Sequence, residues 1–199
     1  MTEQDDAAPL AANERQRERF NTLAWPHLSA VLRTATILTG GNQFDAADLA
    51  QETMLRAFRG IDGFSGSVDD ARKWLLTILR NCRTDRLRTI AGSSPPMSLD
   101  ALEHDPAAVP TSADHDDEWK NPRELLNRFA DAEIITALKQ LPEDIRWTLL
   151  LTDVEDLDIR QAAEILNVAP GTIKSRASRG RAMLREILLP LAKDRRIVK

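Results

Sequence analysis

Apolar side chains recur at every third or fourth position through residues 14–90, which is the spacing of one buried face of an α-helix. The pattern predicts three helices, at about residues 14–39, 45–59 and 69–90. Pro26 would kink or interrupt the first helix, because proline has no amide hydrogen to donate. The sequence Gly40-Gly41-Asn42 is a stop signal at its end.

The second and third predicted helices each have an apolar side that would face a core. Asp45 is expected to be the N-cap of the second helix. The expected buried residues are Leu49, Ala50, Met54, Ala57 and Phe58 in the second helix, and Ala71, Leu75, Ile78, Leu79 and Cys82 in the third. Charged residues recur on the opposite side of the second helix, at Asp45, Asp48, Glu52, Arg56 and Arg59.

Residues 158–185 have the pattern of a short helix, a tight turn and a second helix. The short helix would cover residues 161–166 and end at Asn167. Val168 would be the apolar plug that a helix-turn-helix needs between its two helices.

The second helix of this motif is rich in cations. It would start at Pro170 or Gly171, with Thr172 close enough to cap the following amides. Helical spacing turns Ile173, Ala177 and Leu184 inward. It leaves outside, near the end that would enter a major groove, Lys174, Ser175, Arg176, Ser178, Arg179 and Arg181.

The periodicity breaks over residues 91–121, and residues 92–130 have the composition of a flexible acidic linker, with prolines at 95, 96, 106, 110 and 122 and a run of acids at 114 and 116–118. Strand signals are weak, since the chain has no Tyr and no hairpin turn between alternating runs. We therefore expect an all-α fold of two small helical domains joined by this linker, the C-terminal one a helix-turn-helix. The expected divisions are a disordered tail over 1–13, domains over 14–91 and 131–192, and a C-terminal tail over 193–199.

Composition limits the class of protein. A chain of 199 residues with 42% apolar and 29% charged residues is ordinary for globular domains. The single Cys82 excludes an intramolecular disulfide, and no apolar run approaches the ~20 residues that cross a bilayer. The acidic, mixed-charge start is unlike a signal peptide, so we expect a cytoplasmic protein without stable membrane association.

Charge is segregated along the chain. The net charge is −4, yet residues 172–196 hold eight Lys or Arg against two Asp or Glu. Residues 72–88 hold six cations against Asp85 alone. Two separate contacts with a phosphate backbone would explain this segregation. The alternative for the C-terminal segment is a solvated basic helix at the end of a bundle.

The loop between the second and third helices, residues 62–67, combines two glycines, two hydroxyls and Phe64. It could line a pocket for an unstacked base, but a plain surface loop with Phe64 tucked into the core fits the composition equally well. Trp74 could stack on a base, although a Trp at helical spacing is more often a core residue.

Catalytic and metal-binding motifs are missing from the sequence. The carboxylates of Asp45, Asp48 and Glu52 share a helix face, but no His or Cys accompanies them, so docking to a partner is favoured over a metal site. A glycine-rich phosphate loop and a nucleophile elbow are also absent. We expect no cofactor, no metal and no enzymatic activity.

Three segments in order resemble a known family. They are DAADLAQETMLRAF at 45–58, ARKWLLTILRNCRTDRLR at 71–88, and LPEDIRWTLLLTDVEDLDIRQAAEILNVAPGTIKSRASRGRAMLR at 141–185. Together they look like a bacterial RNA polymerase sigma factor of the extracytoplasmic-function group. Ala162 and Ala177 depart from the larger apolar residues that are usual in the family, which predicts a different or looser core in the second domain.

The resemblance implies an alternative sigma factor that binds core RNA polymerase, through the β′ clamp helices and the β flap, and is controlled by an anti-sigma factor. It implies docking to the polymerase by Asp45, Asp48, Gln51, Glu52 and Arg56. It implies recognition and melting of minus-10 promoter DNA by Phe64, Ser65, Ser67, Arg72, Lys73, Trp74, Arg80, Asn81 and Asp85. It implies recognition of minus-35 DNA by Pro170, Gly171, Thr172, Lys174, Ser175, Arg176 and Arg179.

Two other classes of DNA-binding protein are alternatives to a sigma factor. A DNA-binding regulator that works without polymerase would lack the docking motif at 45–58 and would more often carry an effector or dimerisation domain. An enzyme acting on nucleic acid would need a metal or nucleophile cluster. The sequence meets neither expectation.

Overall fold

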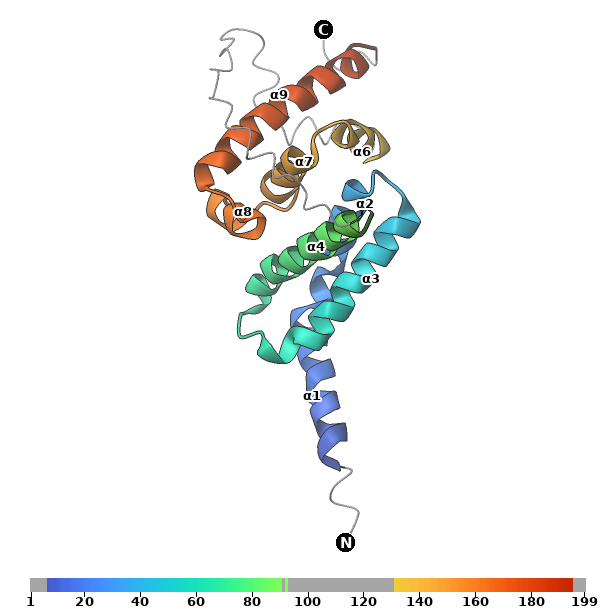
Figure 1. The fold of residues 1–199 in the computed structure, drawn as a ribbon, viewed down its shortest axis with the longest axis vertical. Coiled ribbons are helices and arrows are strands. Elements are labelled where there is room, and N and C mark those ends of the chain that lie inside the picture. Colours follow the sequence, from blue (N-terminus) through green and yellow to red (C-terminus); the bar gives the residue numbers. More distant parts are fainter. Residues whose placement is uncertain (1–6, 91, 93–130, 195–199) are drawn as a thin grey trace. The chain divides into compact units, whose positions relative to one another are not determined.

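The computed structural model describes residues 7–90, 92 and 131–194. The chain divides into two compact units, Met1–Thr84 and Asp85–Lys199, and each is described by itself. The described residues form helices and turns and contain no strand, as an all-α fold requires (Figure 1). Apart from Gly92, the predicted linker at 92–130 lies outside the described residues, as does most of the predicted C-terminal tail.

The first predicted helix is interrupted at Pro26. Helix α1 covers Ala7–Leu23, a 3₁₀ turn covers Trp25–His27, and α2 covers Leu28–Leu38. The half-buried His27 lies in this turn, and its Nε2 is 2.8 Å from the carbonyl oxygen of Val68. Helix α1 begins well before residue 14, so the helix extends into residues 1–13, for which the sequence predicted a disordered tail.

Helix α3, Gln43–Gly60, is capped by Asn42 and not by Asp45 as predicted. The backbone of Asn42 is extended, and its side-chain oxygen accepts hydrogen bonds from the amides of Phe44 and Asp45, at 3.1 and 3.3 Å. Its Nδ2 donates to the Asp45 carboxylate at 2.7 Å. The sequence places Asn42 in the stop signal of the preceding helix. The turn between the two helices is so short that Asn42 caps α3 as well.

Helix α4, Val68–Ile90, follows a 3₁₀ turn at Ile61–Gly63. Four of the five residues predicted to be buried in α4 are buried, and Leu76 joins them. Ile78 is the exception, because it is half-buried. The largest fully buried side chains of this unit are Leu38, Leu49, Ile61, Leu75, Leu76 and Leu79.

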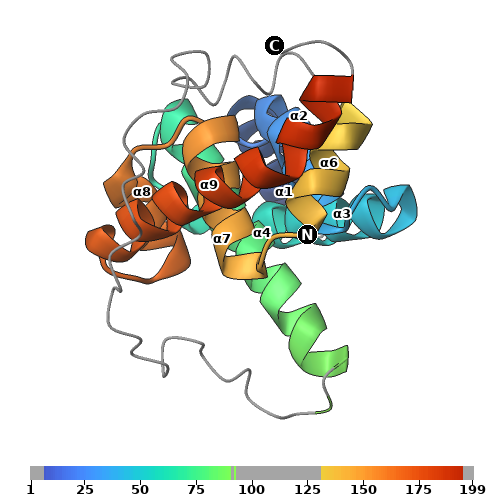
Figure 2. The ribbon, with the colours of Figure 1, turned by 90° about the horizontal axis from the view of Figure 1, so that it is seen from above.

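Beyond the end of α4, the described part of the second unit contains four α-helices. They are α6 (Asp131–Lys139), α7 (Glu143–Leu149), α8 (Ile159–Leu166) and α9 (Pro170–Asp194), with a π-helical segment at Leu150–Val154 that continues α7. Figure 2 shows the long α9 lying across α7 and beside α8. Arg146, only 9% exposed, ties α7 to the end of α6 by donating to the carbonyl oxygens of Leu138, Lys139 and Leu141.

The helix-turn-helix is formed as the sequence predicted, with sharper boundaries. Asp158 and Gln161 make a reciprocal capping box at the start of α8, and Asn167 ends α8 in the left-handed conformation, with φ of 54°. Val168 is half-buried in the turn. Thr172 is not a cap, because α9 already begins at Pro170.

Small residues allow α9 to approach its neighbours closely. Ala162 and Ala177 are buried, so the core of this unit closes around small side chains. A Cβ at Gly180 would lie 2.6 Å from Ile145 Cγ2 and 3.0 Å from Leu149 Cδ1 on α7. At Gly180, α9 therefore approaches α7 so closely that a larger residue would clash, a contact that helical periodicity does not predict.

Candidate polymerase and nucleic-acid interfaces

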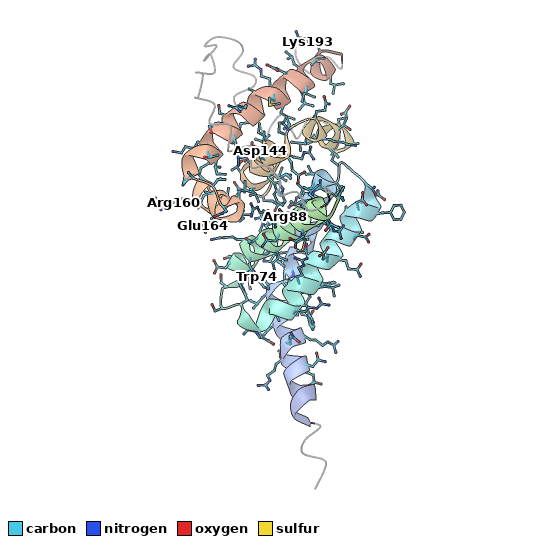
Figure 3. The ribbon with its side chains drawn as sticks, viewed as in Figure 1. Trp74, Arg88, Asp144, Arg160, Glu164 and Lys193 are labelled. Carbon is cyan, nitrogen blue, oxygen red and sulfur yellow. The ribbon has the colours of Figure 1, made fainter. Side chains whose placement is uncertain are left out.

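A hollow of about 550 Å³ opens between the end of α3, the following loop and α4. The rings of Phe64 and Trp74 stack there with centroids 4.7 Å apart and an angle of 22° between their planes. Both side chains are half-buried, so each lies between a core position and an exposed one. Ile78 and Asn81, one and two turns further along α4, line the same space. We call this space the aromatic hollow; Figure 3 labels Trp74 on α4.

The loop that carries Phe64 is tied down on both sides. Arg19 on α1 donates from Nη2 to the carbonyl oxygen of Phe64 at 2.7 Å, and reaches that of Ile61 at 3.4 Å. On the other side, the amide and hydroxyl of Ser67 donate to Asp70 Oδ2 at 2.9 and 2.7 Å. The hydrogen bonds from Ser67 lower the pKa of the Asp70 carboxyl below its ordinary value.

The structure brings only some of the predicted minus-10 residues together. Ser65 and Asn81 join the two aromatic rings at the hollow, whereas Ser67 is occupied by the capping interaction with Asp70. The basic residues Arg72, Lys73 and Arg80 are half-buried along α4, and Asp85 is exposed near the end of that helix.

The predicted polymerase-docking residues lie along one face of α3. Asp45, Asp48 and Gln51 are exposed. Glu52 and Arg56 are half-buried and form an ion pair with an N–O distance of 2.6 Å, one helical turn apart. The side chain of Arg56 also lines the aromatic hollow, so this residue connects the docking face to the hollow.

An apolar groove of about 430 Å³ lies beside that face, and the sequence analysis did not predict it. It runs between α1, α2 and α3, and Gln51 belongs to its lining. Three large apolar side chains along it are strongly exposed, Trp25 at 54%, Leu55 at 48% and Leu32 at 39%. Their helical spacing resembles that of core residues, so the sequence pattern alone does not distinguish these exposed side chains from buried ones.

The exposed face of the helix-turn-helix holds most of the predicted minus-35 residues. Ile173, Ala177 and Leu184 are buried as predicted. Thr172 is half-buried. The residues that stay exposed on the first three turns of α9 are Pro170, Gly171, Lys174, Ser175, Ser178 and Arg179. Figure 3 shows Arg160 and Glu164 pointing outward from the adjoining α8.

Two arginines of α9 pair with acids of their own unit. Only Arg176 departs from the prediction that it stays outside, because Arg181 keeps 42% of its side chain exposed. Arg176 pairs with Asp144 on α7 at 3.2 Å, and its side chain is only 15% exposed. Arg181 makes two hydrogen bonds to the Asp153 carboxylate, at 2.6 and 2.9 Å, and this pairing raises the pKa of Arg181. Helical periodicity does not indicate acids on other helices, so the sequence could not show these pairings.

The described residues contain no group of three or more His, Cys, Asp or Glu side chains that could hold a metal ion. Within the same part of the chain, no helix combines the length and the apolar character that crossing a membrane would need.

Comparison with known proteins assigns the two units to one family. Residues 25–91 match sigma-70 region 2, and residues 131–184 match sigma-70 region 4. These matches define a sigma factor built from these two regions.

Individual relatives show which group of sigma factors this chain resembles. The chain is 34% identical over 161 residues to the ECF RNA polymerase sigma factor EcfG of Rhodopseudomonas palustris, covering 79% of this chain and 78% of that protein. It is 32% identical to the ECF RNA polymerase sigma factor SigE of Mycolicibacterium smegmatis, covering 85% of this chain and 61% of the relative. The chain belongs to the extracytoplasmic-function (ECF) family of RNA polymerase sigma factors.

A solved structure agrees with this assignment. It is the sigma factor RpoE in complex with the anti-sigma factor NepR from Bartonella quintana, with a TM-score of 0.62 and 28% sequence identity. The match covers 85% of this chain and 96% of that one.

Proposed function

We propose that this ECF sigma factor binds core RNA polymerase through α3, opens promoter DNA at the aromatic hollow and reads the minus-35 element with α9. The observation that carries the proposal is the presence of two different candidate nucleic-acid surfaces in one chain. The hollow, with two stacked rings, suits an unstacked base, whereas the helix-turn-helix suits an intact major groove. A promoter-melting factor needs both.

The aromatic hollow would hold a base from the opened non-template strand at minus 10. Stacking of a base on an aromatic ring contributes about 1–3 kcal/mol, which helps to offset the free energy of unpairing the base. Asn81 and Ser65 would supply hydrogen bonds to the edge of the base. The strand would be guided along α4 by the positive charges of Arg72, Lys73 and Arg80. The same proposed surface includes the exposed Asp85 and Ser67, which hydrogen-bonds to Asp70.

The exposed residues at the start of α9 would meet the minus-35 duplex. Lys174 and Ser175 lie where a recognition helix contacts base edges, and Pro170, Gly171 and Thr172 present the helix N-terminus to a phosphate. Arg179, one turn beyond Ser175, would contact the sugar-phosphate backbone. Arg176 is the weakest member of the predicted set, because its guanidinium pairs with Asp144.

The polymerase contact would combine charge with apolar area. The carboxylates of Asp45, Asp48 and Glu52 lie on α3, which also lines the apolar groove through Gln51, so a basic, apolar helix pair such as the β′ clamp helices would contact both surfaces. The second unit would contact the β flap. We infer that the protein acts by binding and not by catalysis, and that it works in the cytoplasm, where bacterial RNA polymerase transcribes.

Regulation by an anti-sigma factor completes the proposal. The complex of the related RpoE with NepR supports it, since the match covers both units of this chain. Exposed apolar side chains such as Trp25 and Leu55 would be covered either by that partner or by the polymerase.

The test is assembly with core polymerase and run-off transcription from a promoter library. Asp48→Arg should reduce co-purification with core polymerase at least about tenfold, because like charges at an interface cost several kcal/mol. Glu14→Arg reverses another exposed carboxylate, on α1, and serves as the control. Equal co-purification of the two variants would reject the docking face, and tight promoter-specific binding by the free chain would favour a regulator.

A further inference from the structure

The position of the Phe64 ring, and not only its presence, sets the shape of the aromatic hollow. The ring lies almost parallel to the Trp74 indole, at 22° and 4.7 Å between centroids. Both side chains are half-buried, so the apolar core does not hold the Phe64 ring on every side. Contacts outside the core must therefore hold the loop in place, and the loop itself must leave room for the ring.

Gly66 leaves that room. A Cβ at residue 66 would lie 2.5 Å from Cζ of Phe64 and 2.8 Å from Cβ of Asp70. The backbone of Gly66 does not have a positive φ, so an L-residue could adopt its conformation. Glycine is required at this position by the space that the Phe64 ring and the Cβ of Asp70 occupy.

Arg19 fixes the loop from the side of α1. Its guanidinium donates to the carbonyl oxygen of Phe64 at 2.7 Å, across a sequence separation of 45 residues. A charged donor on a backbone carbonyl is a strong anchor. It acts on the backbone of the residue whose side chain forms the stack, while Ser67 and Asp70 hold the other end of the loop.

We propose that Arg19 and Gly66 are positioning residues, which hold the Phe64 ring against Trp74 and so preform the hollow that receives the minus-10 base. The inference rests on the proposed function of the hollow. A preformed site loses less conformational entropy when the base enters than a loop that must order first. Arg19 lies outside the lining of the hollow and Gly66 offers it no side chain, so each acts through the position of Phe64.

The first experiment compares two glycines of the same loop. Run-off transcription uses the full chain with core RNA polymerase on a promoter library randomised over the minus-10 element. Gly66→Ala should lower transcription about tenfold and flatten the preference at one base position, because the ring must leave its place. Gly63→Ala adds the same methyl group to the lining of the hollow, but its Cβ would meet no atom within 4 Å, so this variant controls for a methyl group that leaves the Phe64 ring in place. Equal flattening by both variants overturns the role of Gly66.

A double variant tests whether Gly66 acts through Phe64. Phe64→Ala alone should flatten the preference at the same base position, and Gly66→Ala should add no further loss in that background. Full additivity of the two losses overturns the proposal. If Phe64→Ala itself leaves the preference sharp, the assignment of the hollow to the minus-10 base fails, which is a separate outcome.

A second pair of variants does not depend on how Gly66→Ala folds. Arg19→Ala should reproduce the flattened preference with a loss of about threefold to tenfold, whereas Arg17→Ala removes an exposed cation from the same helix and should keep the preference sharp. Arg19→Lys should restore part of the preference, since an ammonium group can donate to the same carbonyl. Co-purification with core polymerase confirms that each variant assembles. A sharp preference in assembled Arg19→Ala overturns the role of Arg19.

Discussion

The two surfaces that we propose for promoter DNA are built in opposite ways. The aromatic hollow lies between elements that are far apart in the sequence, and its shape depends on contacts from α1, the 61–67 loop and α4. The DNA-facing side of the second unit is the exposed face of one continuous helix, α9. The function of the hollow depends on its shape. The function of α9 depends on which of its side chains point outward.

This difference decides which substitutions should damage each surface. A change that moves a ring or a loop by one or two ångströms should alter the hollow, even where no charge is altered. The same small shift should matter less on α9, where long cations adapt to a phosphate backbone, unless the change moves the whole helix. The packing of α9 on α7 is therefore the point at which the second surface is as sensitive to shape as the first.

Gly180→Val should have the largest effect on the second unit. The Cβ alone would lie 2.6 Å from Ile145 Cγ2, so overpacking is expected to destabilise this unit by about 2–3 kcal/mol. Native-state hydrogen exchange of amides in α7 and α9 measures the loss. Gly171→Val on the same helix is the control, because a Cβ at residue 171 would meet no atom within 4 Å. Equal protection in both variants would mean that the helices do not pack at Gly180 as described.

Lys174→Ala should affect DNA recognition and leave stability unchanged, because the side chain is exposed. If Lys174 contacts a base edge, the variant should lose about 1–3 kcal/mol of free energy of promoter binding, and the preference at the contacted minus-35 position should be relaxed. Transcription from minus-35-dependent promoters should fall accordingly. Arg179→Ala should instead weaken all promoters alike and reduce the salt dependence. A minus-35 saturation library at two salt concentrations separates the two outcomes. Identical profiles would remove the distinction between base reading and backbone contact on α9.

The sequence predicted the parts of the fold that local periodicity controls. The helix-turn-helix, its left-handed Asn167 and the buried Ile173, Ala177 and Leu184 follow from spacing and turn chemistry within about twenty residues. The cap of α3 was misplaced by three residues, because Asn42 can either end one helix or start the next. Only the length of the turn decides between these two roles.

Contacts between distant segments escaped the sequence analysis. The partner acids of Arg176 and Arg181, the tight crossing at Gly180 and the apolar groove beside α3 all require two or more elements to be in place. Composition left Phe64 undecided between core and pocket. The structure places it between those alternatives, stacked on Trp74 at the edge of the hollow. Roles of individual residues toward DNA and polymerase stay predictions.

The pair of Arg176 and Asp144 should have a smaller effect than Lys174. Since Arg176 is turned toward α7, Arg176→Ala is expected to destabilise the unit by about 0.5–1 kcal/mol and to keep the minus-35 preference. Asp144→Ala should cost a similar amount, and the double variant should cost less than the sum. Urea titrations of the four proteins measure the coupling. Additive losses together with a relaxed minus-35 preference would restore Arg176 to the groove, as the sequence first suggested.

The smallest effect concerns the exposed cap of the loop at Asp70, where the hollow depends on charge as well as shape. Hydrogen bonds from Ser67 lower the pKa of Asp70 in the folded chain, so its ionised form stabilises the fold at pH values above the unfolded pKa of about 4. That contribution should disappear as the pH falls through the lower, folded pKa. Asp70→Asn should therefore lower the thermal midpoint of the first unit slightly at pH 7, and the difference from the parent chain should vanish on acidification. Asp69→Asn, a neighbouring exposed residue, controls for the loss of one negative charge. If the difference between Asp70→Asn and the parent chain stays constant from neutral to acidic pH, the carboxylate does not stabilise the loop, and Arg19 becomes the main polar anchor of the hollow.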